Sequence, residues 1–203
     1  MVRGRDERSR LTRMPNQTAI IIAMTVAGLT SSFMFMLVIP IQAELPGLLN
    51  ASRADTAWVV TSTLLAAAII APISGRLGDM YGKRRIVLIL LAAMVLGSVL
   101  AAVSSELVLV IIGRTLQGAM TGVIPLGIAI LRDTLHQNRV DTAIALNSAT
   151  MGIGGAIGMP LSAYVAEIGD WHLLFWMSAV LGAICFIRVI RCIPPRALRT
   201  EGP

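Results

Sequence analysis

Charged residues are scarce in this chain of 203 residues. They make up 14% of the sequence, whereas a soluble domain carries roughly 25%. Hydrophobic residues reach 56%, and the mean hydropathy is +0.78. This balance excludes an ordinary soluble domain and favours a protein that is embedded in a membrane.

Residues that build metal and redox sites are also rare. There are two cysteines, Cys185 and Cys192, and two histidines, His136 and His172. The cysteines lie seven residues apart on the cytoplasmic half of the last apolar segment, where no disulfide is expected, and the scattered histidines indicate no metal site. The sequence has no Walker motif, and no grouping of serine, histidine and aspartate suggests a hydrolase. We therefore expect no enzyme, cofactor or metal, and we interpret His172 as part of an interfacial belt.

Six long stretches contain no charge, apart from Arg114 inside the fourth. A membrane-spanning helix needs about 20 mostly apolar residues, and its backbone must be bonded within the segment. The last stretch is shorter and gains length if Arg188 snorkels to the interface. The sequence thus predicts an all-α integral membrane protein with six transmembrane helices in residues 17–190, a polar Arg-rich tail (1–16) and a second tail (191–203). The charge-free stretches are 14–43, 56–75, 86–105, 107–131, 142–166 and 171–187.

The positive charges between these stretches fall on one side. Fifteen of the 17 Lys and Arg residues lie before the first stretch, after the sixth, or in the second and fourth connections. The remaining connections hold only Arg53, and Arg114 lies within a stretch. By the positive-inside rule both termini are cytoplasmic, as six crossings also require. The basic loops then meet anionic lipid of the bilayer, so the pI near 10.6 does not indicate a nucleic-acid partner.

The connection between the second and third stretches, residues 75–85, carries a specific motif. Its glycines permit a tight reversal, and Asp79 is the one acid among four cations. An acid in this place can pair with the cations or cap the N-terminus of a nearby helix. The alternative is a positive-inside loop with an incidental acid. The other motif residues are Gly75, Gly78, Gly82, Lys83, Arg84 and Arg85.

This loop resembles the helix 2–3 motif of the major facilitator superfamily, and three further segments match that family in order. Residues 114–118 resemble its helix-4 motif, residues 154–160 its helix-5 antiporter motif, and residues 38–46 the end of helix 1 in the fourteen-helix drug:proton antiporters. The resemblance implies the N-terminal six-helix half of such a transporter, a half-bundle of two three-helix repeats in the plasma membrane. It also implies proton-coupled efflux of small, amphipathic, drug-like molecules, with the substrate held between two halves.

Two positions depart from that family pattern. The residue nine places before Pro40, where the family carries an acid, is Ser31, and Pro160 is shifted by one place in the antiporter motif. A second interpretation is a truncated half that does not transport and is either inert or modulates a full-length carrier. On both interpretations, we expect a second transporter half or a second copy of this chain to complete the assembly.

Arg114 is the first candidate for the transport site. It lies eight positions inside Glu106, about 12 Å from the outer end of its helix. A guanidinium at that depth costs at least a few kcal/mol unless it is paired or wetted. Gln117 and Gly118 share its helix face, and the resemblance assigns the matching arginine to proton coupling. The alternative is a structural arginine satisfied by backbone carbonyls or water.

The fifth stretch carries polar and small residues at helical spacing. Asn147, Gly154 and Gly158 lie on one face, and small residues of this kind let membrane helices approach closely. Helix packing is therefore one interpretation of the stripe. The other is functional, with Asn147 at a cavity and Pro160 bending the outer gate, as the resemblance implies.

Overall fold

The computed structural model describes residues 17–193, so the predicted N-terminal tail and residues 194–203 of the C-terminal tail lie outside the described part. All elements of regular secondary structure in that part are helices, and six spans are long and apolar enough to cross a membrane. The predicted all-α fold with six spanning helices is confirmed for these residues. The spans are α2 (Gln17–Met36) with η1 (Pro40–Ala43), α4 (Arg53–Tyr81), α5 (Lys83–Val103), α6 (Leu107–Gly118) with η2 (Ala119–Gly122) and α7 (Val123–Thr134), α8 (Gln137–Ile168), and α9 (His172–Cys192).

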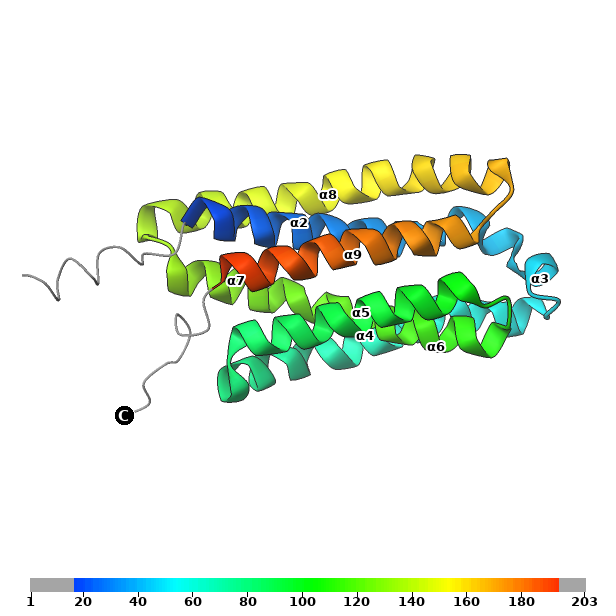
Figure 1. Cartoon of the computed structure of the whole chain (residues 1–203), viewed down its shortest axis with the longest axis horizontal. Coiled ribbons are helices and arrows are strands. Elements are labelled where there is room, and N and C mark those ends of the chain that lie inside the picture. Colours follow the sequence, from blue (N-terminus) through cyan, green and yellow to red (C-terminus); the bar gives the residue numbers. More distant parts are fainter. Residues whose placement is uncertain (1–16, 194–203) are drawn as a thin grey trace, which may run out of the picture.

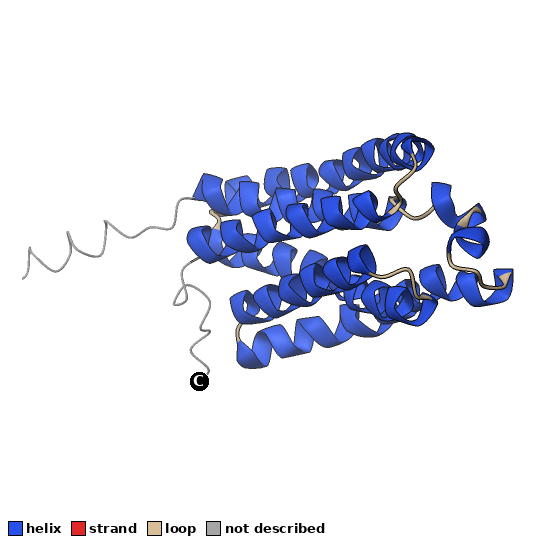
Figure 2. Cartoon of the chain, turned by 45° about the vertical axis from the view of Figure 1, so that its right-hand side comes forward, coloured by secondary structure: helices blue, strands red, loops and turns tan. Residues whose placement is uncertain are grey.

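The six spans run along the long axis of one bundle (Figure 1). α2 packs against α8 and α9, whereas α5 packs against α6 and α9, and α4 packs against α6. The connections are short and lie at the two ends of the bundle (Figure 2), except that the first connection contains the small helix α3 (Leu45–Leu48). The start of α2 and the end of α9 lie at the same end (Figure 1), as an even number of crossings requires.

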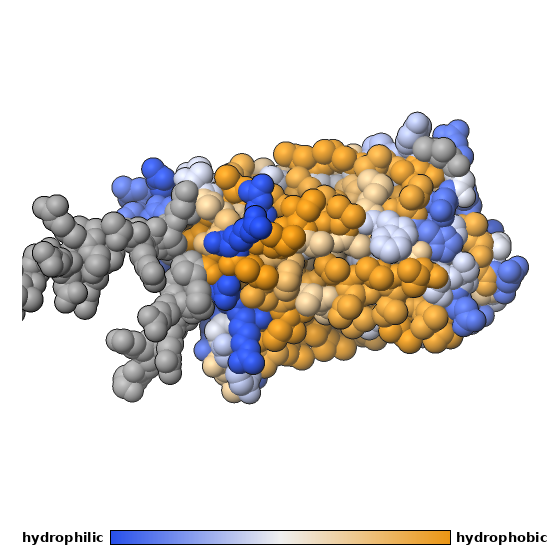
Figure 3. Space-filling view, in the orientation of Figure 1, coloured by the Kyte–Doolittle hydropathy of each residue, from blue (hydrophilic) through white to orange (hydrophobic). Residues whose placement is uncertain are grey.

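The surface separates into a hydrophobic band and two hydrophilic ends. Figure 3 shows hydrophobic side chains over the middle of the bundle and hydrophilic ones at both ends. Inside, one buried cluster surrounds Met24, Leu91 and Met120, and a second surrounds Leu37 and Phe175. This distribution matches a bundle whose middle lies in hydrocarbon and whose ends lie in water.

The fourth span is not one continuous α-helix, although the sequence predicted a single helix over 107–131. A 3-10 segment, η2, separates α6 from α7. Pro125 lacks the N–H that would bond to the carbonyl of Thr121, so the regular hydrogen-bond ladder cannot continue there. On both sides of η2 the helix lies close to α4, because a Cβ added at Gly118 would stand 2.5 Å from the carbonyl oxygen of Thr63. At Gly122, the last residue of η2, an added Cβ would stand 2.7 Å from the Cβ of Ser74, which also lies on α4.

The predicted stripe on the fifth span packs against the first. A Cβ added at Gly154 would stand 2.5 Å from the carbonyl oxygen of Leu29, and one added at Gly158 would stand 3.1 Å from that of Phe33. The hydroxyl of Ser162 donates to the carbonyl of Leu37 across the same seam. The missing side chains at the two glycines thus allow α8 to lie directly on the backbone of α2.

Candidate functional site

The motif at residues 75–85 is mostly helical rather than a loop. α4 continues through Gly75 and Gly78 to Tyr81, and α5 begins at Lys83. Gly82 alone makes the reversal, with φ of 94° and ψ of 125°, a region that side-chain-bearing residues rarely adopt. The sequence predicted the tight turn but not that one glycine would be sufficient for it.

The cations of this motif tie the start of α5 to two other helices. Lys83 Nζ lies 2.5 Å from Asp133 Oδ2 at the end of α7, and Arg84 Nη2 donates to the carbonyl of Ile190 near the end of α9 at 3.1 Å. Asp79 is exposed at the last turn of α4 and has no ion pair or hydrogen bond within residues 17–193. Of the two roles considered for Asp79, neither an ion pair with the motif's cations nor a side-chain cap on α5 is present among residues 17–193, and Lys83 pairs with Asp133 instead.

Arg114 lies at the centre of a buried polar chain. Its side chain is 2% exposed, Nε donates to the carbonyl of Val59 on α4 at 3.3 Å, and Nη1 donates to Gln117 Oε1 at 2.7 Å. The amide of Gln117 donates in turn to the hydroxyl of Ser98 on α5 at 2.8 Å, and Ser98 donates to the carbonyl of Met94. The Gln117 amide oxygen thus accepts a hydrogen bond while its nitrogen donates one, and together these bonds fix the orientation of the side chain.

This chain of hydrogen bonds contains no carboxylate. All eight acids within residues 17–193 are exposed, including Glu44 and Glu167. Arg114 therefore has no acidic partner among the described residues. A guanidinium has five N–H donors, and two of them have protein acceptors here.

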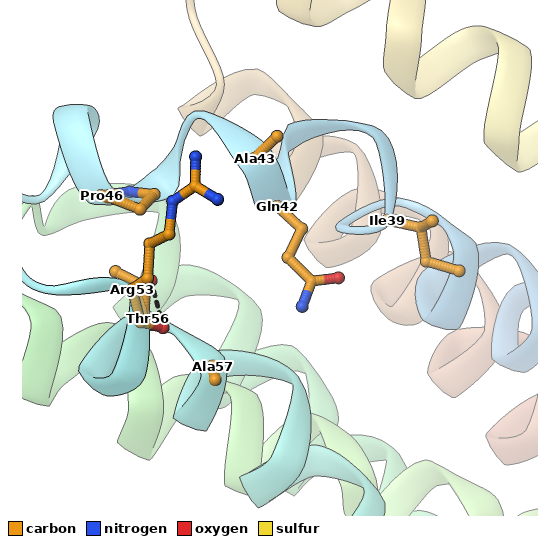
Figure 4. A pocket seen from close by; sticks show the side chains of 7 residues that line it. All are labelled: Ile39, Gln42, Ala43, Pro46, Arg53, Thr56 and Ala57. Atoms are coloured by element: carbon orange, nitrogen blue, oxygen red, sulfur yellow. Dashed lines mark hydrogen bonds between the residues drawn. The ribbon is translucent and has the colours of Figure 1, made fainter.

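A cavity of about 400 Å³ opens at the end of the bundle opposite the start of α2 and the end of α9. Figure 4 shows that the side chains of Gln42 and Arg53 reach into the space between η1 and the start of α4. Thr56 lines its floor on α4, and Val59 follows one helical turn deeper on the same face. Since the carbonyl of Val59 accepts from Arg114, α4 connects this cavity to the buried polar chain.

Asn147 is buried between α8 and α2. It is 3% exposed and lies against Gly28 of α2, where an added Cβ would stand 2.6 Å from Asn147 Oδ1. That oxygen has no hydrogen-bond partner among the described residues, and Thr150, one turn further along α8, bonds to backbone carbonyls. The residue therefore belongs to the α2–α8 seam.

Asp170 and His172, which are neighbours in the sequence, meet Ser105 at the same end of the bundle as the cavity. Asp170 Oδ1 lies 2.9 Å from Nδ1 of His172, whose Nε2 lies 3.2 Å from the hydroxyl of Ser105. Hydrogen bonds from the side chain and backbone of His172 hold the pKa of the Asp170 carboxyl below its usual value. Ser105 is 67 residues away in the chain, so no local pattern could reveal the contact. The contact between Ser105 and His172 joins the α5–α6 connection to the α8–α9 connection.

Comparison with known sequences decides the family. The family profile described as Major Facilitator Superfamily matches residues 20–202. The chain belongs to this superfamily. The predicted resemblance is thereby confirmed, and 203 residues with six spans fit the N-terminal half of a superfamily transporter.

Relatives in the superfamily agree with this assignment. The chain is 28% identical over 198 residues to the probable multidrug resistance protein EmrY of Escherichia coli, covering 95% of this chain and 39% of that protein. It is 29% identical over 147 residues to a protein named triacylglyceride transporter from Mycolicibacterium hassiacum, covering 71% and 27%. The chain therefore spans well under half the length of these relatives.

A solved structure shows the same fold. The proton:xylose symporter XylE superposes with a TM-score of 0.76 at 14% identity, covering 86% of this chain and 44% of that one. At that level of identity the likeness concerns the arrangement of helices alone.

Proposed function

We propose that this chain forms the N-terminal wall of a secondary transporter in the plasma membrane that expels small amphipathic molecules in exchange for protons. Two relatives support the type of cargo, since one is named a probable multidrug resistance protein and the other a triacylglyceride transporter. The observation that carries the proposal is the buried guanidinium of Arg114. Both termini are cytoplasmic in this proposal because of the charge asymmetry of the loops.

Burial of the Arg114 guanidinium is unfavourable, and hydrogen bonds to Val59 and Gln117 hold the side chain in place. An arginine inside a membrane bundle costs about 3 kcal/mol or more, and such residues mark substrate or proton pathways. Val59 and Gln117 use two of its donors and leave the others for an anionic group. We propose that these remaining donors hold a carboxylate that exchanges protons during transport.

The coupling carboxylate has to reach Arg114 from another part of the assembly. All eight described acids are exposed near the helix ends, and Ser31 occupies the place at which the family carries an acid. We therefore propose that the acid is supplied by a second half, which reaches Arg114 when the bundle opens during transport. Alternating access then arises as the two halves rock about the site between them.

The exposed face of α8 supports a protein partner. A stripe at helical spacing on this face consists of Ala145, Ala149, Gly152 and Ala156, all exposed. Beside this stripe α8 exposes larger side chains such as Ile153, and the exposed faces of α5 and α9 carry large side chains such as Leu96 and Val180. Small residues permit close helix contacts in lipid. We propose that α8 faces a second half or a second copy, whereas α5 and α9 face lipid.

Cysteine crosslinking in native membranes tests this arrangement. A cysteine placed at Gly152 should crosslink to another transporter chain, whereas one placed at Leu96 on the lipid-facing side should not. Equal crosslinking at both positions would contradict the proposed face. The crosslinked assembly is then reconstituted, and dye efflux is measured after an imposed pH gradient.

The flux measurement separates the proposed function from the alternative. We expect proton-driven efflux from the assembled pair, none from dilute single chains, and loss of efflux in Arg114→Gln. Assemblies that form but move neither dye nor protons would favour the non-transporting half. A dilute monomer that transports against a proton gradient would overturn the proposal, since the site would then lie within six helices.

A further inference from the structure

The outward face of α9 is apolar along most of its length and ends in arginines. Val180, Ile184 and Ile187 are 56%, 45% and 47% exposed, and Arg188 and Arg191 follow as exposed residues. Residues three and four apart lie on one helix face, so these five form one stripe. The charged end of the stripe lies at the last turn of α9.

The neighbouring helix α5 repeats this pattern in the opposite chain direction. Arg85 is exposed in its first turn, and Ile89 and Leu96 are 54% and 62% exposed further along the same face. α5 and α9 pack side by side, and the start of α5 meets the end of α9 through the hydrogen bond from Arg84 to Ile190. The two helices therefore form one surface with an apolar middle and an arginine-rich end.

The charges at this end are not balanced by acids. Neither α5 nor α9 contains an acidic residue. Of the cations gathered here, Lys83 has an acidic partner, Asp133, whereas no ion pair within residues 17–193 involves Arg84, Arg85, Arg188 or Arg191. Figure 3 shows hydrophilic side chains at the border of the hydrophobic band where α9 ends and α5 begins.

The guanidinium of Arg84 has donors that no acceptor within residues 17–193 uses. Its Nη2 donates to the carbonyl of Ile190, and its Nε is buried without any hydrogen-bond partner among the described residues. Arg84 as a whole is half-buried, so its guanidinium can reach an acceptor at the surface of α5 and α9. An anionic oxygen is the acceptor that also suits the arginines around it.

We propose that this α5–α9 surface binds an anionic phospholipid. The phosphate group lies between Arg84, Arg188 and Arg191, and an acyl chain lies along the apolar stripe past Ile187. A free phosphate ion would use the arginines but would gain nothing from the stripe. Charged headgroup contacts beside apolar helix faces are the arrangement by which membrane proteins hold particular anionic lipids.

Native mass spectrometry of the purified full chain tests the proposal. The chain is presented with equal amounts of phosphatidylglycerol and phosphatidylcholine, and the ratio of bound lipids is measured. We expect a clear preference for phosphatidylglycerol, which falls about fivefold for each arginine replaced in Arg188→Gln and Arg191→Gln. The corresponding Arg→Lys variants should keep most of the preference.

Matched controls decide between a site and a general charge effect. Arg132→Gln with Arg139→Gln removes the same charge from the same end of the bundle, but from α7 and α8 rather than from α5 and α9. An equal loss of preference in that control, or no preference in the original chain, would overturn the proposal. Displacement of the lipid by millimolar inorganic phosphate would also overturn it, since the site would then bind a free anion. Circular dichroism of each variant establishes that the helices remain folded.

Discussion

Replacing Gly154 with alanine tests the close contact between α8 and α2. The added Cβ would stand 2.5 Å from the carbonyl oxygen of Leu29 and 3.3 Å from its Cα. Ordinary contact begins at 3.4 Å, and the obstacle is helix backbone rather than the flexible end of a side chain. The two helices therefore have to separate by almost 1 Å at this point.

The expected cost follows from what the separation disturbs. A gap of 0.5–1 Å removes roughly a quarter to a half of the dispersion energy of each contact across it. The hydrogen bond from Ser162 to Leu37 and the contact between Gly158 and Phe33 lie further along the same seam. Overpacking of this kind costs about 1–3 kcal/mol, and we expect Gly154→Ala to destabilise the bundle by that amount.

Gly152 provides the matched control two residues away on the same helix. An added Cβ there meets nothing within 4 Å. Because alanine is the better helix former, Gly152→Ala should be neutral or stabilising by up to about 1 kcal/mol. The assay is unfolding of both variants in mixed micelles, followed by circular dichroism. Equal destabilisation by the two substitutions, or none by either, would refute the reasoning about the seam.

Three further outcomes are expected. Gln117→Ala should cost about 2 kcal/mol in the same unfolding assay, because it leaves a buried guanidinium donor without its acceptor, whereas a change below 0.5 kcal/mol would mean that the amide does not hold it. The lowered pKa of Asp170 means that its hydrogen bonds with His172 stabilise the fold above the ordinary aspartate pKa, and that this contribution is lost as the pH falls through the lowered value. The melting temperature of Asp170→Asn should therefore fall less at acid pH than that of the original chain. An equal fall in both would contradict this. An impermeant maleimide should label a cysteine at Arg53 from outside but not one at Lys83, and the opposite result would reverse the orientation.

Local patterns in the sequence predicted the spans and several candidate residues. Long charge-free runs identified six helices, and the helical spacing of Gly154 and Gly158 placed them on one face of α8. Arg114 was noticed because a charge inside an apolar run is costly in lipid. These inferences need only the chain itself, since every membrane helix bonds its own backbone and each side chain's face follows from helix geometry.

The tertiary structure decided which helices are neighbours and which polar groups meet. Gln117 bonds to Ser98 on the preceding helix, Lys83 pairs with Asp133 fifty positions away, and Arg84 reaches Ile190 on α9. Apolar stripes could not reveal these partners, because lipid tails are as apolar as the helix faces and hydropathy does not distinguish a face that meets protein from one that meets lipid. Helix order in the bundle depends on close packing at glycines and on buried hydrogen bonds, and both become apparent only when the six helices are assembled.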